Sequence, residues 1–117
     1  MRRQLQSEVN SVNRVDLTAC IAEASPLRYT PAGIPALNLV LEHSSEMVEA
    51  GTTRQVNLTV KAVAFGTLAE QSARLQMGKA FRFTGFLVNA RGSKSVVFHL
   101  QAVQVIEPVL ESVPNPI

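Results

Sequence analysis

Apolar side chains recur at every second position on both sides of a short turn sequence, Thr30–Gly33 (T-P-A-G). The apolar positions are 15, 17, 19 and 21 before the turn and 37, 39 and 41 after it. Because successive side chains of a β-strand point to opposite faces, this period predicts two half-buried strands, over residues 12–24 and 36–44. Pro31 fixes its own φ and Gly33 can adopt a positive φ, so the turn sequence predicts a tight reversal that joins the strands into a hairpin.

A third alternating stretch follows a polar, acidic segment. Residues 43–53, H-S-S-E-M-V-E-A-G-T-T, contain a glycine and few apolar side chains, and they predict a connecting loop. Residues 54–64 predict a strand whose even positions carry mostly apolar side chains and whose odd positions carry polar ones such as Lys61. One face of this strand is therefore expected to pack in the core and the other to face water.

The period changes in the next segment. Residues 65–75, F-G-T-L-A-E-Q-S-A-R-L, place apolar side chains at helical intervals, and Gly78 supplies a stop signal, which predicts one short helix. Residues 79–89 and 95–106 predict two further strands, joined by the turn sequence N-A-R-G-S-K. The chain is therefore expected to end its ordered part with a second hairpin.

The predicted element order is β-β-β-α-β-β, an all-β fold with one short helix. This is the order of the OB fold, a five-stranded barrel, and the alternative is another small barrel or a sandwich. The alternation selects the side chains that are expected in the core, which are Leu17, Ile21, Leu39, Leu41, Val56, Leu58, Phe81, Phe83 and Phe98. Phe81, Phe83 and Phe98 in particular fit a barrel interior better than a binding surface.

Length and composition indicate one small globular domain. The chain has 117 residues, of which 46% are hydrophobic and 17% charged. We expect an OB domain over residues 13–107, a flexible N-terminal arm over 1–12 and a proline-containing tail over 108–117. No leader and no apolar run of about 18 residues is present, and Cys20 is the single cysteine, so a cytoplasmic protein with no membrane association is expected.

The charges are divided unevenly along the chain. Residues 4–53 contain two basic and six acidic side chains, whereas residues 54–106 contain seven basic side chains and one acidic one. Such an asymmetry favours an anionic partner such as nucleic acid. A fold that brings the two halves together and neutralises both would give the same sequence pattern, so the charge alone leaves both interpretations open.

The sequence contains no motif that indicates catalysis. It lacks H-E-x-x-H, G-x-S-x-G, C-x-x-C and a glycine-rich phosphate loop, so no enzyme activity is expected. The two histidines, His43 and His99, have no cysteine or carboxylate at metal-site spacing, and we expect structural or surface roles for them. No cofactor and no metal site is therefore predicted. Two hypotheses of different class remain, a nucleic-acid-binding module and a protein-binding adaptor.

Several short motifs, taken together in order, resemble a known family. They are R-Y-T-P-A-G-I-P and E-H-S around the first hairpin, A-G-T-T-R-Q before the third strand, and G-F and I-E in the last two strands. This set is similar to the family of bacterial primosomal replication protein N (PriB), over residues 13–107. That family is a relative of bacterial single-stranded DNA-binding protein, whose strand-to-helix segment the sequence K-A-V-A-F-G-T-L-A-E also resembles.

The resemblance implies both a fold and a function. It implies an OB-fold homodimer, formed largely through residues 13–20, that binds single-stranded DNA without strong sequence preference. It also implies partners, namely the replication-restart helicase and other primosome proteins, which the protein helps to act at stalled forks. The alternatives are a protein-binding OB adaptor with little DNA affinity and a single-stranded DNA-binding protein proper, although the chain has no tryptophan for the latter's base stacking.

Seven residues are candidates for contacts with nucleic acid. The resemblance implies Arg28 and Arg54, and it places Arg91 and Lys94 on the last hairpin, whereas two aromatic positions of the family fall on Thr52 and Asn57, which have no ring. The pattern of charged and aromatic positions adds three more. The complete set is Arg28, Tyr29, Arg54, Lys61, Arg82, Arg91 and Lys94.

Overall fold

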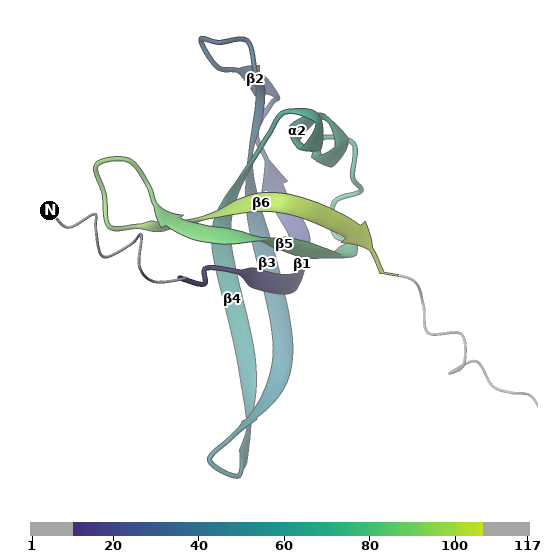
Figure 1. The fold of residues 1–117 in the computed structure, drawn as a ribbon. Helices are drawn as coiled ribbons and strands as arrows, with labels where there is room; N and C mark the ends of the chain where they lie inside the picture. Colours follow the sequence, from purple (N-terminus) through teal and green to yellow (C-terminus); the bar gives the residue numbers. More distant parts are fainter. Residues whose placement is uncertain (1–10, 107–117) are drawn as a thin grey trace, which may run out of the picture.

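The protein folds as a β-barrel with one helix packed at one end (Figure 1). This computed structural model describes residues 11–106 of the chain. The elements are β1 (Val15–Ala24), β2 (Arg28–Tyr29), β3 (Pro35–Glu49), β4 (Thr52–Phe65), α2 (Thr67–Ser72), β5 (Ala80–Asn89) and β6 (Val96–Val105). The predicted order is confirmed, because β2 is only a two-residue pairing of Arg28–Tyr29 with the start of β3, inside the first hairpin.

Five strands close the barrel. The neighbours in the sheet are β1, β5, β6, β4 and β3, and β1 closes the ring by pairing with β3 as well. The first half of β1 pairs with β5 from Val15 to Cys20, and its second half pairs with β3. A parallel contact between β4 and β6, Ala62 opposite Phe98, completes the closure. This closed arrangement is the predicted OB fold.

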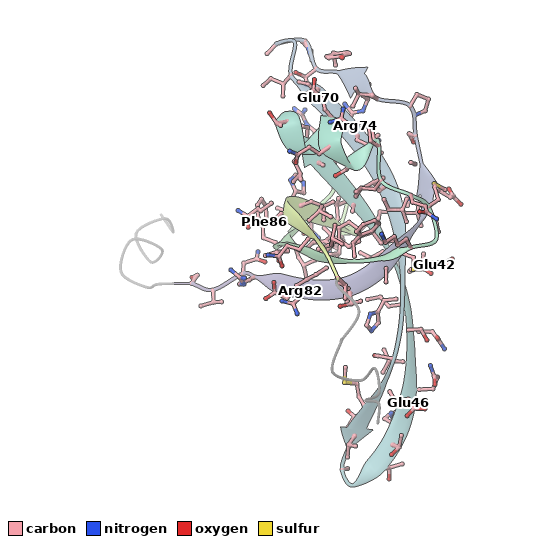
Figure 2. All side chains as sticks on the ribbon, turned by 90° about the vertical axis from the view of Figure 1, so that its right-hand side faces the viewer. Glu42, Glu46, Glu70, Arg74, Arg82 and Phe86 are labelled. Carbon is pink, nitrogen blue, oxygen red and sulfur yellow. The ribbon has the colours of Figure 1, made fainter. Side chains whose placement is uncertain are left out.

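The long hairpin of β3 and β4 extends beyond the barrel as a two-stranded ribbon (Figures 1 and 2). The ribbon comprises the seven cross-strand pairs from His43 opposite Leu58 to Glu49 opposite Thr52, and no other strand of the described chain pairs with it. Ala50 and Gly51 form its turn, both with positive φ (50° and 77°), as a two-residue hairpin loop requires. The prediction of a loop over residues 43–53 was therefore wrong.

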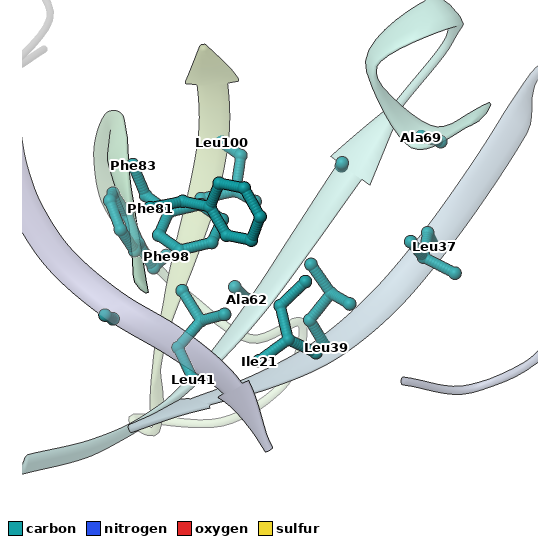
Figure 3. Packing of buried hydrophobic residues seen from close by; sticks show 12 residues of the cluster. Ile21, Leu37, Leu39, Leu41, Ala62, Ala69, Phe81, Phe83, Phe98 and Leu100 are labelled. Atoms are coloured by element: carbon teal, nitrogen blue, oxygen red, sulfur yellow. The ribbon is translucent and has the colours of Figure 1, made fainter. Parts of the chain in front are cut away.

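The interior of the barrel holds a single apolar cluster (Figure 3). The cluster consists of Ala19, Ile21, Leu37, Leu39, Leu41, Ala62, Ala64, Ala69, Phe81, Phe83, Phe98 and Leu100. Phe83 and Phe98 are fully buried, and the rings of Phe81 and Phe83 meet edge to face with centroids 6.3 Å apart. Six of the nine residues predicted for the core are confirmed as buried, and Leu17 is half-buried against the cluster.

Two of the predicted core residues do not belong to it. Val56 is half-buried and Leu58 is 43% exposed, because both lie on the ribbon and not within the barrel. The alternation was interpreted correctly, since their side chains do share the face of β4 that becomes the interior at Ala62. The error lay in assuming that the barrel extends along the whole strand.

The helix is shorter than predicted. α2 ends at Ser72, whereas the spacing predicted a helix to Leu75. The N–H groups of Arg74 and Leu75 donate to carbonyl oxygens three residues earlier, so the chain leaves the helix in a tighter turn. Gly78 then donates its N–H to the carbonyl oxygen of Ile21 at 3.2 Å, which attaches this connection to β1.

Both chain ends lie outside the described residues. The expectations for most of the N-terminal arm over residues 1–12 and for the tail over 108–117 concern that part of the chain. Where the described domain begins, the side-chain amide of Asn13 donates to the carbonyl oxygen of Leu87 at 2.8 Å and accepts the Leu87 N–H at 2.9 Å. Within residues 11–106, no helix is long and apolar enough to span a membrane.

Candidate nucleic-acid interface

A groove of about 370 Å³ lies on the outer face of β3 and β4. Its floor is formed by side chains whose neighbours along each strand point into the core, namely Asn38 and Val40 of β3 and Lys61 and Val63 of β4. Val97 of β6 closes one side. Lys61 thus lies on the solvent face of β4, as the sequence predicted, and it is the only basic side chain in the lining of this groove.

The first hairpin brings Arg28 to this groove. The Nη2 group of Arg28 donates to Oδ1 of Asn38 at 3.1 Å, and Asn38 lines the groove. Tyr29, the next residue, is 61% exposed and pairs through its backbone with Pro35. The hairpin turn is held by the Gly33 N–H, which donates to the carbonyl oxygen of Thr30 at 2.7 Å. Arg28 is therefore held at the groove, and Tyr29 lies exposed next to it.

The last hairpin carries two further cations. Arg91 and Lys94 are exposed on the turn between β5 and β6, which the Ala90 N–H closes by donating to the carbonyl oxygen of Ser95 at 2.8 Å. Lys94 precedes the groove residue Val97 by three positions. The two hairpins that flank the binding face in OB folds thus both carry basic side chains in this protein.

Three rings lie against one another on the same outer surface, across β4, β6 and β5. One pair is stacked, and the other, Phe65 with His99, is tilted by 42°. The imidazole of His99 lies against Phe86, with centroids 5.2 Å apart and planes inclined by 26°, and against Phe65, with centroids 5.9 Å apart. Phe65 is 43% exposed and follows Lys61 and Val63 on the outer face of β4. We refer to Phe65, His99 and Phe86 as the ring stack.

The three residues of the ring stack were not predicted as site residues, although the sequence contains a signal for them. Phe65 occupies the odd, polar face of β4, and His99 directly follows the core residue Phe98 and must face outward. An aromatic side chain on the wet face of an otherwise alternating strand is the informative observation. Phe65 offers a ring to solvent, which Thr52 and Asn57 cannot.

Arg54 and Arg82 lie apart from this groove. Arg54 is on the ribbon, where its Nε donates to Oε1 of Glu49 at 3.0 Å, so the acidic half of the chain partly neutralises the basic half. Such an exposed ion pair contributes roughly 0–1 kcal/mol and does not prevent other contacts. Arg82 lies on the outer face of β5 beside β1. The structure therefore brings together Arg28 and Lys61, with Tyr29, Arg91 and Lys94 on the flanking hairpins.

The ionised form of Asp16 is favoured on β1, where Asp16 lies opposite Thr84 of β5. The Thr84 hydroxyl donates to Asp16 Oδ1 at 2.6 Å, and Arg14 donates to Asp16 Oδ2 at 3.1 Å. These hydrogen bonds, that of Thr84 first, and the positive charges of Arg14 and Arg82 hold the pKa of the Asp16 carboxyl below its ordinary value. Asp16 thus stays ionised at neutral pH.

His43 of β3 and Cys20 of β1, whose side chains could react or bind a metal, lie in structural surroundings. The Nδ1–H of His43 donates to the carbonyl oxygen of Thr18 at 2.6 Å, and its Nε2 lies 2.8 Å from Ser45 Oγ, so His43 connects the base of the ribbon to β1. Cys20 is a half-buried free thiol on β1. Over the described part of the chain, no three His, Cys, Asp or Glu side chains gather as metal ligands.

Comparison with known proteins assigns the chain to a family. Residues 13–102 match the family described as another single-strand binding protein family. Replication restart protein PriB of Bordetella pertussis is 46% identical over 96 residues, which are 81% of this chain and 90% of that protein. Replication restart protein PriB of Neisseria gonorrhoeae is 37% identical over 81% of this chain and 92% of that protein.

Solved structures agree with this assignment. The structure of PriB from Ralstonia solanacearum has a TM-score of 0.75 and 36% sequence identity, and it covers 83% of this chain and 100% of its own. The single-stranded DNA-binding protein of Thermus aquaticus has a TM-score of 0.68 at 24% identity, over 85% of this chain and 52% of its own, which supports the OB fold. The matched family is described by binding and not by a reaction. The chain therefore belongs to the replication restart protein PriB family, a relative of the single-stranded DNA-binding proteins.

Proposed function

We propose that this protein is a single-stranded DNA-binding accessory factor of the replication-restart primosome, and that it binds DNA across the outer face of β3, β4 and β6. The observation that carries the proposal is the exposed Phe65 ring, backed by His99 and placed on the same strand face as Lys61. The relatives named as replication restart proteins support the primosome role. In this role the protein would act with the restart helicase and other primosome proteins.

The chemistry of the face suits a single strand. An aromatic ring can stack on any base, which provides affinity without sequence preference, and cations at the groove can contact the phosphates. Arg28 uses one N–H for Asn38 and keeps other donors for a phosphate oxygen. We therefore propose Arg28, Lys61, Arg91 and Lys94 as phosphate contacts, with Tyr29 and Phe65 as stacking residues, while Arg54 could extend this set along the ribbon.

Binding of labelled single-stranded oligonucleotide, followed by fluorescence anisotropy, tests the proposal. With four phosphates neutralised, log K should fall against log salt with a slope of about −3, since single strands give about −0.7 per contact. Phe65→Ala should weaken binding by about 1–3 kcal/mol through lost stacking. Lys61→Glu should weaken binding and make the slope less negative.

Matched variants separate these effects from general ones. Arg74→Glu makes the same change of net charge at an exposed residue after α2, and Met77→Ala removes an apolar side chain that is 51% exposed and far from the rings in sequence. Both controls should bind like the wild type. If the wild-type protein does not bind even at low salt, the DNA-binding proposal fails and the protein-binding adaptor takes its place.

We further propose that the protein acts as a two-fold symmetric dimer, assembled through β1 and the ribbon. The edge of β1 from Val15 to Ala19 that faces away from β5 pairs with no strand of the described chain. One side of the adjacent ribbon presents Met47, Val56 and Leu58 to solvent or leaves them only half-buried. An open strand edge next to a sheet face with three apolar side chains is a surface that a second copy can cover by an isologous contact.

Light scattering coupled to gel filtration tests the dimer. We expect about twice the chain mass of 12.7 kDa. Leu58→Glu should shift the protein toward the monomer, because a charge on the apolar side of the ribbon resists burial. Thr53→Glu places the same charge on the opposite side of the ribbon, across from Val48, and should leave the dimer intact. A monomer at micromolar concentration, for the wild-type protein, would contradict this assembly.

A further inference from the structure

A second cleft, of about 860 Å³, lies on the outer face of β1, β5 and β6, away from the groove described above. It is lined by Arg14, Asp16, Thr18, Arg82, Thr84, Gln101, Ala102 and Gln104. The lining is almost entirely polar and contains no aromatic ring. The surface is thus unlike the centre of most protein interfaces, where aromatic and large apolar anchors provide most of the binding energy.

One guanidinium in this cleft, that of Arg82, makes no direct ion pair or side-chain hydrogen bond within the described residues, although its charge also acts on Asp16. Asp16 accepts hydrogen bonds from Arg14 and Thr84, so its negative charge is already matched. Arg82 makes no ion pair and no side-chain hydrogen bond with any residue between 11 and 106. An exposed guanidinium with five donors, beside the amides of Gln101 and Gln104, can receive an anionic oxygen.

The cleft and the ring stack both lie on the outer face of β5. Phe86, Thr84 and Arg82 occupy alternate positions of this strand and face outward, whereas Phe83 and Gly85 between them are buried. Figure 2 shows Phe86 and Arg82 on the same side of the barrel, with Arg82 closer to β1. The two residues are four positions apart on the strand, which is roughly 13 Å at about 3.3 Å per position. Thr84 is therefore the one outward residue between the ring of Phe86 and Arg82 on this strand.

We propose that this cleft binds the continuation of the same single strand of DNA, and that Arg82 contacts its phosphates. The proposal rests on the proposed function, because the strand first stacks on Phe65 and then follows the outer face of β5. A distance of roughly 13 Å corresponds to two to four nucleotides, at about 3.4 Å or more for each. The cleft provides no stacking contact to a base, since no aromatic ring lines it.

Oligonucleotide length separates this contact from the primary site. We compare Arg82→Gln with the wild-type protein, using labelled oligodeoxythymidines of about 4 and about 16 nucleotides, the two ends of the range of sizes bound by OB folds. The variant should bind the long oligonucleotide several-fold more weakly at about 0.1 M salt, with a salt slope less negative by about 0.7. Its affinity for the short oligonucleotide should be unchanged, because a strand that occupies the groove and the rings has no nucleotides left to reach Arg82. The positive charge that is lost also lies roughly 13 Å from Phe86, beyond the Debye length of about 10 Å.

The outcomes distinguish the two proposals. Arg74→Gln is the matched control and should bind both lengths like the wild type. If Arg82→Gln binds the long oligonucleotide as tightly as the wild type, or weakens both lengths equally, the second contact is refuted while a loss of binding in Phe65→Ala still supports the first site. If Arg82→Gln changes the mass measured by light scattering, the cleft is an interface between copies and the proposal is overturned. If the wild type binds neither length, both proposals fail together.

Discussion

Replacing Phe83 by alanine is expected to remove about 3–5 kcal/mol of the free energy of unfolding, the range observed for fully buried phenylalanines. Phe83 has no exposed surface, lies opposite Leu17 of β1 and Val103 of β6, and meets the ring of Phe81 edge to face. Its loss would leave a cavity where three strands meet. Since small domains are stable by only about 5–15 kcal/mol, the variant is expected to be partly unfolded at moderate temperature.

Urea unfolding, followed by circular dichroism at one fixed protein concentration, measures this change. Val88→Ala serves as the control, because Val88 lies on the same strand and is 42% exposed. The control should shift the free energy of unfolding by about 0.5 kcal/mol or less. If Phe83→Ala unfolded at the same urea concentration as the wild type, the interior face assigned to β5 would be wrong.

Replacing Gly85 by alanine is expected to destabilise the protein by about 3 kcal/mol or more, because no space exists for the added carbon. A Cβ atom built on Gly85 overlaps the carbonyl oxygen of His99 and lies 3.0 Å from the Cα atom of Leu100. These are backbone atoms of the paired strand and cannot rotate away. The variant must therefore separate β5 from β6 at the point where their register already shifts.

The same substitution should also weaken DNA binding in any protein that remains folded. Gly85 precedes Phe86, which stacks on His99, so a displaced strand would disturb the ring stack. Gly33→Ala is the matched control, because Gly33 has a positive φ of 83° but open space around it. The free energy of unfolding of this control should fall by about 1 kcal/mol, from backbone strain alone. Equal decreases of the free energy of unfolding in the two variants would show that the close approach at Gly85 can relax.

The order of elements and most of the core could be predicted because burial imposes a period on the sequence. Phe81 and Phe83 alternate with Arg82 and Thr84, and in a strand with one face in water this pattern places both rings in the core. The ribbon could not be recognised in the same way. Both of its faces are largely exposed, so residues 43–53 show little alternation and look like a loop. Its pairing becomes visible only in three dimensions.

The sequence could predict on which side of its strand each candidate residue lies. It could not predict which of these residues come together on one surface. Alternation correctly placed Lys61 on the solvent side of β4. The same alternation places Phe65 on that side, although Phe65 was not predicted as a site residue. Which cations share a surface depends on how the barrel closes. Arg82 is an outward residue like Lys61, yet it lies on the sector of the barrel formed by β1, β5 and β6. No local pattern in the sequence contains that information.

The backbone amides of β3 and β4 are expected to have two different levels of protection from hydrogen exchange, one in the barrel and one in the ribbon. Between Ala36 and Leu41, β3 belongs to a closed barrel, and the amide groups there become accessible only when much of the domain opens. Beyond His43 the same two strands have no third neighbour in the described chain and few buried side chains, so they can separate locally at a much lower free energy. Hydrogen exchange would thus rise along a single hairpin from its base to its tip. Any second copy or partner that binds the ribbon would suppress this opening by mass action, which makes the tip the part of the fold most sensitive to assembly.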